Sequence, residues 1–355
     1  MVYVHIPFCG SFCTYCGFYS ETVCPGADFK DFTQEICAEI ESRKDEIAAT
    51  APVDTLYIGG GTPSLIPLES LSRIAGAVMK ALSPYGKKHS FREFTVEVNP
   101  EDIVTRGEEY VRGLLDIGVN RVSMGVQSLD DGILRWMNRR HDVSGALSAY
   151  DILRKAGVRN ISIDIIYGIS HLSDAVLLDT VNGIVALRPE HISAYQLGID
   201  EDSILWSMVS DGRYGEASDE QCRHQYSLVC SALRDAGYEH YEISNWAMPG
   251  FRAVHNSAYW TRAPYVGIGP GAHSFSILPP SDVAGASCRT EQRRSWNSSS
   301  LTGWERSSEV LSPEEIREEE VMLGLRTLEG WDGRQLSEEE WFVSDDIISD
   351  ILARS

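Results

Sequence analysis

The sequence contains no run of about 18 or more apolar residues, so it predicts no helix that would cross a membrane. No charged leader precedes the first apolar segment, and we expect no secretory signal peptide. Basic residues are also few: 31 Lys and Arg stand against 52 Asp and Glu, which gives a net charge of −21. Nucleic-acid binding needs clustered positive charge, so that class of partner is not expected. Together these absences favour a cytoplasmic protein.

Cysteine is present, but without the pattern of a disulfide-stabilised secreted domain. Of eight cysteines, only Cys9, Cys13 and Cys16 are closely spaced, as C-x3-C-x2-C directly after an apolar segment. Soft thiolates select zinc, copper(I) or iron–sulfur clusters. A closed zinc site usually has four ligands in two pairs, whereas no fourth cysteine or histidine accompanies this triplet. The spacing favours an iron–sulfur cluster with one open iron. A zinc site completed from afar and free thiols are the alternatives.

Apolar, β-branched segments alternate with amphipathic helical segments along two thirds of the chain. The predicted strands are residues 2–6, 55–58, 94–98, 121–126, 161–166 and 191–197. The predicted helices are residues 29–47, 68–82, 109–115, 144–155, 172–187 and 219–236. This order indicates an α/β fold with parallel strands and right-handed crossovers. Six units are too few for an eightfold barrel, so a partial (β/α)6 barrel and a doubly wound sheet both fit.

Polar residues lie at or just beyond the carboxyl end of each predicted strand, where parallel α/β folds place their sites. They are the three cysteines, the Gly-Gly-Gly-Thr-Pro-Ser segment at 59–64, Glu97, Gln127, Asp164 and Gln196. The glycines allow close backbone approach to a ligand, although a tight turn is an equally good interpretation of that segment alone. A carboxylate at Glu97 or Asp164 suits a ribose hydroxyl or an ammonium group. Gln127 and Arg139 add an amide and a cation.

After residue 238 the pattern changes. His255, Tyr259 and Trp260 combine an imidazole with aromatic side chains, which suits a porphyrin whose iron takes His; a hydrogen-bonded core cluster is the structural alternative. Residues 279–308 are rich in Ser, Pro, Gly and Arg and predict an irregular, mobile segment. Residues 312–328 predict a helix capped by Ser312.

Taken in order, these motifs resemble radical S-adenosylmethionine (SAM) enzymes of the oxygen-independent coproporphyrinogen III oxidase group. The resemblance covers about residues 2–275 and includes Tyr3 to Cys16, residues 59–64, 97–100 and 125–128, Asp164 and residues 255–260. It implies a partial (β/α)6 barrel at residues 1–237 and a smaller, mainly helical C-terminal region at 238–355. It also implies that Cys9, Cys13 and Cys16 hold a 4Fe-4S cluster whose open iron binds SAM. The implied SAM contacts are Tyr3, Tyr15, Gly60, Gly61, Thr62, Glu97, Gln127, Arg139, Asp164, Gln196 and His273.

One position separates two branches of this group. The oxidases carry a fourth cysteine two residues after the third, where this chain has Phe18. The His-Asn-x-x-Tyr-Trp motif at 255–260 is typical of the other branch, the HemW-type haem chaperones. The resemblance therefore implies a haem chaperone, with oxidative decarboxylation of coproporphyrinogen III as the alternative, and with His255, Tyr259 and Trp260 as haem contacts. We predict that His255→Ala weakens haem binding.

The resemblance also implies partners. They are haem or a porphyrin, haem-accepting proteins such as respiratory enzymes, and an electron donor for the cluster. A homodimer stays open, with at most peripheral contact with a membrane. The chain departs from the group where Gly168-Ile169-Ser170 replaces a usual Gly-Leu-Pro, in the composition of residues 279–308, and after Gly330, where we expect a shorter C-terminal domain.

Overall fold

A nine-stranded sheet forms the centre of the computed structural model, which describes residues 1–24, 26–50, 55–83, 90–278 and 290–353. The strand order is β11-β1-β4-β5-β6-β7-β8-β10-β9, parallel from β11 to β8 and antiparallel beyond. The six predicted strands are confirmed to within two residues as β1 (Val2–Ile6), β4 (Thr55–Gly60), β5 (Glu93–Val98), β6 (Arg121–Gln127), β7 (Ile161–Tyr167) and β8 (His191–Gln196).

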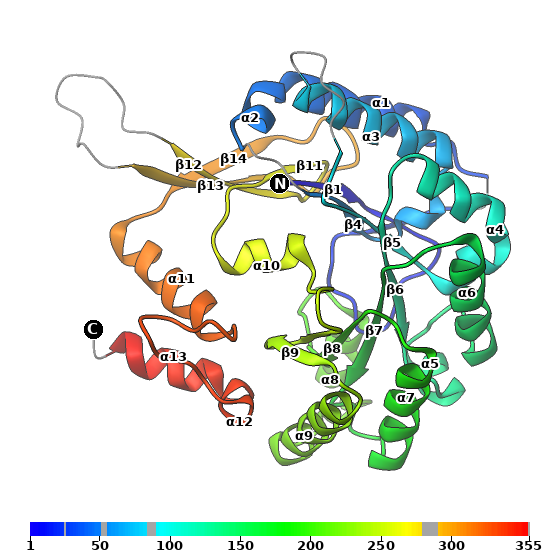
Figure 1. The fold of residues 1–355 in the computed structure, drawn as a ribbon, viewed down its shortest axis with the longest axis vertical. Coiled ribbons are helices and arrows are strands. Elements are labelled where there is room, and N and C mark those ends of the chain that lie inside the picture. The colour runs from blue at the N-terminus through cyan, green and yellow to red at the C-terminus, as the bar shows by residue number, and fades with distance from the viewer. Residues whose placement is uncertain (25, 51–54, 84–89, 279–289, 354–355) are drawn as a thin grey trace.

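Helices cover the outer side of the curved sheet (Figure 1). They are α1 (Lys30–Ser42), α2 (Lys44–Ala49), α3 (Leu68–Leu82), α4 (Pro100–Asp116), α5 (Asp131–Trp136), α6 (Val143–Ala156), α7 (Asp174–Leu187), α8 (Ile204–Ser210) and α9 (Asp219–Asp235). Two predicted helices need correction. Residues 29–47 form two helices, because the backbone leaves helical geometry at Arg43 (φ −107°, ψ 16°). Residues 109–115 are a helix as predicted, but they are the second stretch of α4, after a kink at Gly107 (φ 69°, ψ −171°); the first stretch, which begins with a proline where no backbone N–H is needed, was not predicted.

The sheet curves into an open, partial barrel with a continuous apolar core. Val4, Ile58 and Val96, on neighbouring strands, are fully buried, as expected for parallel strands covered by helices. Helix α10 (Val254–Trp260) lies across the open side, between β11 and β9 (Figure 1). The partial (β/α)6 barrel predicted from the resemblance is thus the observed architecture of the sheet and its helices.

The chain beyond the proposed boundary at residue 237 contributes to this sheet. Strands β9 (Glu239–Glu242) and β10 (Asn245–Ala247) extend it beyond β8, and β11 (Val266–Ile268) pairs with β1. The domain boundary itself stays a prediction.

A second, three-stranded antiparallel sheet follows, made of β12 (His273–Leu278), β13 (Glu291–Asn297) and β14 (Arg306–Val310). The prediction that residues 279–308 are irregular is wrong for β13 and the start of β14; residues 279–289 lie outside the described chain. The chain ends with α11 (Pro313–Leu325), α12 (Glu338–Trp341) and α13 (Ser344–Ala353), which share a small apolar core. The predicted helix at 312–328 is confirmed as α11, with Ser312 as its cap.

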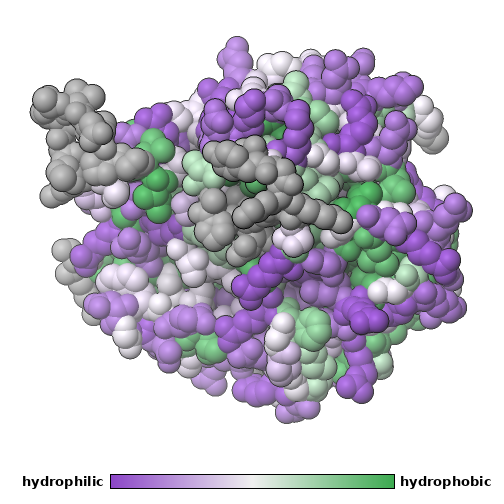
Figure 2. Space-filling model, turned by 45° about the horizontal axis from the view of Figure 1, so that its top comes forward, coloured by the Kyte–Doolittle hydropathy of each residue, from purple (hydrophilic) through white to green (hydrophobic). Residues whose placement is uncertain are grey.

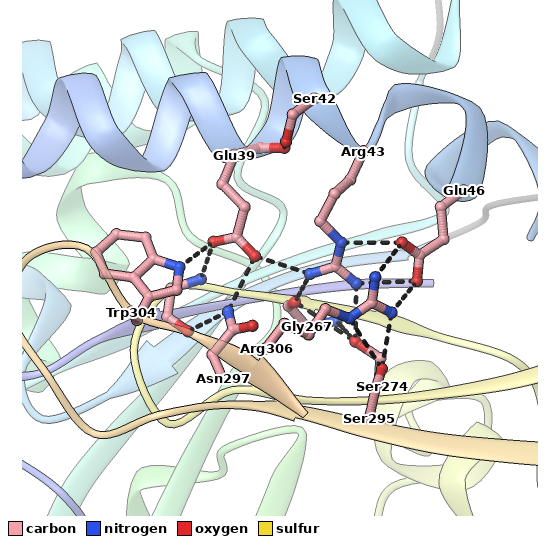
Figure 3. Close-up of polar contacts among 11 residues, drawn as sticks. Glu39, Ser42, Arg43, Glu46, Gly267, Ser274, Ser295, Asn297, Trp304 and Arg306 are labelled. Carbon is pink, nitrogen blue, oxygen red and sulfur yellow. Dashed lines mark hydrogen bonds and ion pairs between the residues drawn. The ribbon is translucent and has the colours of Figure 1, made fainter. Parts of the chain in front are cut away.

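Polar contacts fasten the second sheet to α1 and α2 (Figure 3). The Arg43 guanidinium donates to Glu39 Oε1 at 2.8 Å, to both Glu46 carboxylate oxygens at 3.0 Å and to Ser274 Oγ at 3.0 Å. Arg306 of β14 donates to the same Glu46 carboxylate at 2.6 and 2.9 Å. Burial of Arg43 strengthens these contacts relative to exposed ion pairs, since water competes less for its donors.

Hydrophilic side chains cover most of the face shown in Figure 2, with smaller hydrophobic areas between them. This distribution agrees with the large excess of acidic residues in the chain. Across the described ranges, no helix is both long and apolar enough to span a bilayer.

Candidate active site

The cysteine triplet lies on the loop that follows β1, at the carboxyl end of the parallel strands. Cys9, Cys13 and Cys16 are free, partly exposed and line one cavity of about 660 Å³. The loop is held in place by two bonds from Thr14, whose N–H donates to the carbonyl of Met137 at 3.0 Å and whose hydroxyl donates to the carbonyl of Trp136 at 2.8 Å. The predicted convergence of the three thiols is therefore observed.

The three thiols are the soft ligands of this cavity. Among the described residues that line it there is no further cysteine and no histidine. A closed structural zinc site usually has four such ligands. The set therefore suits an iron–sulfur cluster with one open iron better than a closed zinc site. Burial raises the pKa of Cys9 and, to about 11, that of Cys16, so a bound cation is needed to hold them as thiolates.

The glycine segment after β4 forms one wall of the cavity. Gly60 has φ of 113°, which favours glycine, and its N–H donates to Glu97 Oε2 at 3.0 Å. A Cβ on Gly61 would lie 2.7 Å from the carbonyl oxygen of Phe8, in β2 (Phe8–Cys9), so a side chain would collide with backbone. Thr62 completes the wall, with its hydroxyl 3.6 Å from Cys9 Sγ. Residues 60–62 therefore line the cavity as well as forming the turn after β4.

Two partly buried carboxylates lie on the floor of the cavity. Glu97 of β5 accepts from Tyr57 Oη at 2.6 Å, and Asp164 of β7 accepts from Ser123 Oγ at 3.5 Å. Burial raises the pKa of Glu97 to about 7 and that of Asp164 to about 6. The charged form of each group is therefore poorly solvated and gains from a ligand that donates hydrogen bonds.

Arginines face these acids across the same cavity. Arg139 donates to Asn99 Oδ1 at 2.9 Å and, through Nη1, to Cys13 Sγ at 3.4 Å, while its Nε is buried without a partner among the described residues. Cations and carboxylates that converge in one cavity fit a ligand carrying both an amino and a carboxylate group. The donor set therefore fits SAM bound beside a thiolate-held cluster.

Arg121, at the start of β6, was not predicted. It lines the cavity with only 1% of its surface exposed, and its Nε and Nη1 have no partner in the described part of the chain. Its charge acts on the carboxylates of Glu97 and Asp164, whose pKa values it lowers. Buried donors without an acceptor are costly, so the Nε and Nη1 groups point to an anionic or polar ligand group. A charged residue at the head of an otherwise apolar strand was the available signal. Tyr57, Asn99 and Ser193 also line the cavity and were missed.

The remaining predicted SAM contacts divide into two sets. Tyr15, Gln127 and Gln196 line the cavity with the residues above. Tyr3 lies behind the wall, where its hydroxyl is 3.0 Å from His5 Nδ1. His273 is exposed at the start of β12, stacked on Trp296 with ring centroids 6.2 Å apart, and the structure does not bring it to the cavity lining.

The proposed haem contacts lie on α10. His255 is 1% exposed, and both ring nitrogens have partners: Nδ1 is 2.8 Å from Thr55 Oγ1 and Nε2 is 2.9 Å from Tyr259 Oη. Burial lowers the pKa of His255 to about 3. Trp260 lies at the end of the helix and lines a separate cavity with Arg262 and Trp331. In this conformation His255 and Tyr259 have the geometry of a hydrogen-bonded core cluster, which was the alternative interpretation. The role of the three residues in haem binding stays a prediction.

Comparison with known proteins identifies the family. A model described as the radical SAM superfamily matches residues 3–183, about half of the chain. The chain belongs to the radical SAM superfamily. Membership implies a 4Fe-4S cluster and SAM, in agreement with the thiols and the donor set of the cavity.

Two relatives place this radical SAM protein more narrowly. It is 31% identical to the haem chaperone HemW of Lactococcus lactis over 334 residues, which cover 92% of this chain and 82% of that protein. It is 32% identical to HemW of Bacillus subtilis over 275 residues, or 77% of this chain and 70% of the relative. The chain therefore belongs to the HemW family. Its fold matches the coproporphyrinogen III oxidase HemN of Escherichia coli with a TM-score of 0.71 at 21% identity, covering 92% of this chain and 75% of that one.

Proposed function

We propose that this protein binds haem and transfers it to haem proteins such as respiratory enzymes, on a radical SAM core that carries a 4Fe-4S cluster and SAM. Phe18 carries the proposal. Its side chain is 75% exposed and lines the cavity at the position where the oxidases of the group have a fourth cysteine. The names of the HemW relatives support the same function.

Cys9, Cys13 and Cys16 would hold the cluster, and Arg139, Glu97 and Asp164 would orient SAM from the cavity floor. When bound, this pair of groups supplies one-electron reductive chemistry. Gly60 and Gly61 would form the wall beside the ligand, and their lack of Cβ lets this wall pack closely on His5 and Phe8. We further propose a cytoplasmic protein that receives electrons from a donor, because an exposed cluster needs reducing surroundings.

Haem has two candidate locations. The first is α10, where His255 would have to exchange its hydrogen bond with Tyr259 for iron. The second is the cavity mouth, where Phe12, Phe18 and Tyr195 expose 43%, 75% and 41% of their surface. Exposed aromatic side chains around one cavity suit a planar, largely apolar ligand. If the mouth is the site, Phe18→Ala weakens haem binding more than His255→Ala; the reverse order assigns haem to α10.

Parallel anaerobic titrations with haem and with coproporphyrinogen III, each with SAM, test the function. We expect saturable haem binding and no protoporphyrinogen. Protoporphyrinogen formed in step with 5′-deoxyadenosine would establish the oxidase instead. Loss of iron and of brown colour in Cys13→Ala would confirm that the cluster is held by the triplet.

A further inference from the structure

Three side chains of metal-ligating types meet where the barrel joins the C-terminal helices. Cys230 lies on α9, His240 on β9, and Glu338 is the first residue of α12. One ligand atom from each lies within 4.8 Å of the other two. None of the three lines the cavity described above, so this cluster is separate from the cysteine triplet.

His240 is oriented like a histidine that binds a metal. Its Nδ1 lies 2.8 Å from Glu338 Oε1, and its Nε2 lies 3.4 Å from the carbonyl of Ile243. The ring stacks on Trp246 with centroids 4.0 Å apart and meets the edge of Trp341 at 4.6 Å. Metal-bound histidines commonly donate their second N–H to a carbonyl, which fixes the ring. Nδ1 is therefore directed at the cluster while Nε2 holds the ring in place.

A buried hydroxyl also faces the sulfur of this trio. Tyr226, one helical turn before Cys230 on α9, is only 4% exposed, and its ring lies edge-on to His240, with centroids 6.2 Å apart. Residues four apart share one helix face, and the Tyr226 hydroxyl hydrogen-bonds with the Cys230 sulfur. The same hydroxyl is therefore placed to donate to a thiolate at Cys230.

The ion pair between Arg234 and Glu338 uses only one of the two carboxylate oxygens, so the other can bind a metal ion. Arg234 Nη2 pairs with Glu338 Oε2 at 3.0 Å, whereas Oε1 faces His240. The side chain of Arg234 is 62% exposed, so it stands at the rim of the cluster. A cation bound between the sulfur, Nδ1 and Oε1 would therefore replace the His240–Glu338 hydrogen bond without displacing Arg234.

We propose that Cys230, His240 and Glu338 bind one Zn²⁺. Sulfur, imidazole and carboxylate ligands in a compact trio are the set that zinc prefers, with a fourth position for water. The ion would link α9 and β9 of the barrel to α12. That helix belongs to a small core of Val321, Leu325, Leu336, Trp341 and Ile348, and small cores gain most from a metal link. The site is independent of haem and SAM.

Metal analysis of the full-length, cluster-loaded protein tests this assignment. Zinc is added, excess is removed with a moderate chelator, and zinc and iron are measured by mass spectrometry. We expect about one zinc per chain in the parent and in Cys222→Ser, a buried cysteine on the same helix, and none in Cys230→Ser. Zinc should raise the melting temperature of the parent and of Cys222→Ser, but not that of Cys230→Ser. Equal zinc content in the two cysteine variants would overturn the proposal.

Glu338→Gln tests the carboxylate ligand in a protein that should still fold, because the glutamine oxygen can still accept a hydrogen bond from His240. We expect normal circular dichroism and a zinc affinity at least about tenfold weaker by chelator competition. Unchanged affinity would exclude Glu338 as a ligand and overturn the three-residue site. In the Cys9→Ser/Cys13→Ser/Cys16→Ser background, Co²⁺ should give a thiolate charge-transfer band that Cys230→Ser abolishes. A band that persists would refute thiolate ligation.

Discussion

Binding of SAM should depend on pH through Glu97. This carboxylate lies on the cavity floor, where it accepts from Tyr57 Oη and from the Gly60 N–H. Burial and, to a smaller extent, nearby Asp164 raise its pKa, while the two hydrogen bonds and Arg121 lower it, and the net result is a pKa of about 7. The ionised carboxylate accepts from a ligand ammonium or hydroxyl group more strongly than the neutral acid, which has lost the charge and one acceptor position. Affinity for SAM should therefore fall as the pH drops through 7.

The size of the effect follows from that pKa. Glu97 would be about nine-tenths ionised at pH 8 and about one-tenth ionised at pH 6. If only the ionised form binds, affinity falls about tenfold between these two values, or about 1.4 kcal/mol. Asp164, whose pKa is raised by burial to about 6, adds a further loss toward lower pH.

Anaerobic calorimetric titration of cluster-loaded protein with SAM at pH 6, 7 and 8 measures this dependence. Glu97→Gln is the matched control, because glutamine can still accept from Tyr57 but does not titrate. Glu97→Gln should bind SAM more weakly than the parent at pH 8. Its affinity should no longer fall near pH 7 and should keep only the decrease toward lower pH that Asp164 causes. Titration of SAM itself affects both proteins equally. A flat profile in the parent, or the same tenfold step in Glu97→Gln, would refute the role of Glu97.

Two further predictions concern packing. Arg43→Met should lower the free energy of unfolding by about 3 kcal/mol, because it removes the buried guanidinium that pairs with Glu39 and Glu46. Arg306→Met, which removes a 40% exposed partner of the same Glu46, should cost at most about 1 kcal/mol. Equal shifts in urea midpoint would contradict this. Gly61→Ala should weaken SAM binding, since its Cβ would collide with backbone of β2. Gly76→Ala on α3, where a Cβ meets nothing within 4 Å, is the control: it should keep SAM affinity and raise the free energy of unfolding by up to about 1 kcal/mol. Equal SAM affinity in the two variants would contradict the close packing of Gly61 against Phe8.

The parallel core was predictable because its signals are local. Strands such as β7 are apolar and β-branched along their length, and glycine ends helix α6 at Gly157 with φ of 106°. In a parallel sheet all carboxyl ends share one edge, so residues in the carboxyl-terminal half of each strand and just after it come close together. That rule brought Glu97, Asp164 and the cysteines to one cavity without knowledge of a single tertiary contact.

The second sheet was missed because its signals are not local. Strand β13 reads Glu-Gln-Arg-Arg-Ser-Trp-Asn, a polar segment without alternation. Its order depends on distant partners, such as Glu39 of α1, which accepts from Asn297 Nδ2 at 2.9 Å. Arg121 was missed for a related reason: a charged residue at the head of a strand usually faces solvent, and only the curvature of the sheet makes it a buried cavity residue.

The C-terminal segments also bear on the cysteine loop itself. Strand β11 pairs with Val2, Tyr3 and Val4 of β1, whose far end leads into Cys9. A Cβ on Gly269, just after β11, would lie 2.7 Å from the carbonyl oxygen of His5, so the two backbones are in close contact beside the site. Glu39 accepts from the Gly269 N–H at 2.8 Å and thereby ties this turn to α1. The edge of β1 that positions the cluster loop is thus covered by residues outside the matched family segment, and the barrel and the C-terminal region together hold the cysteines.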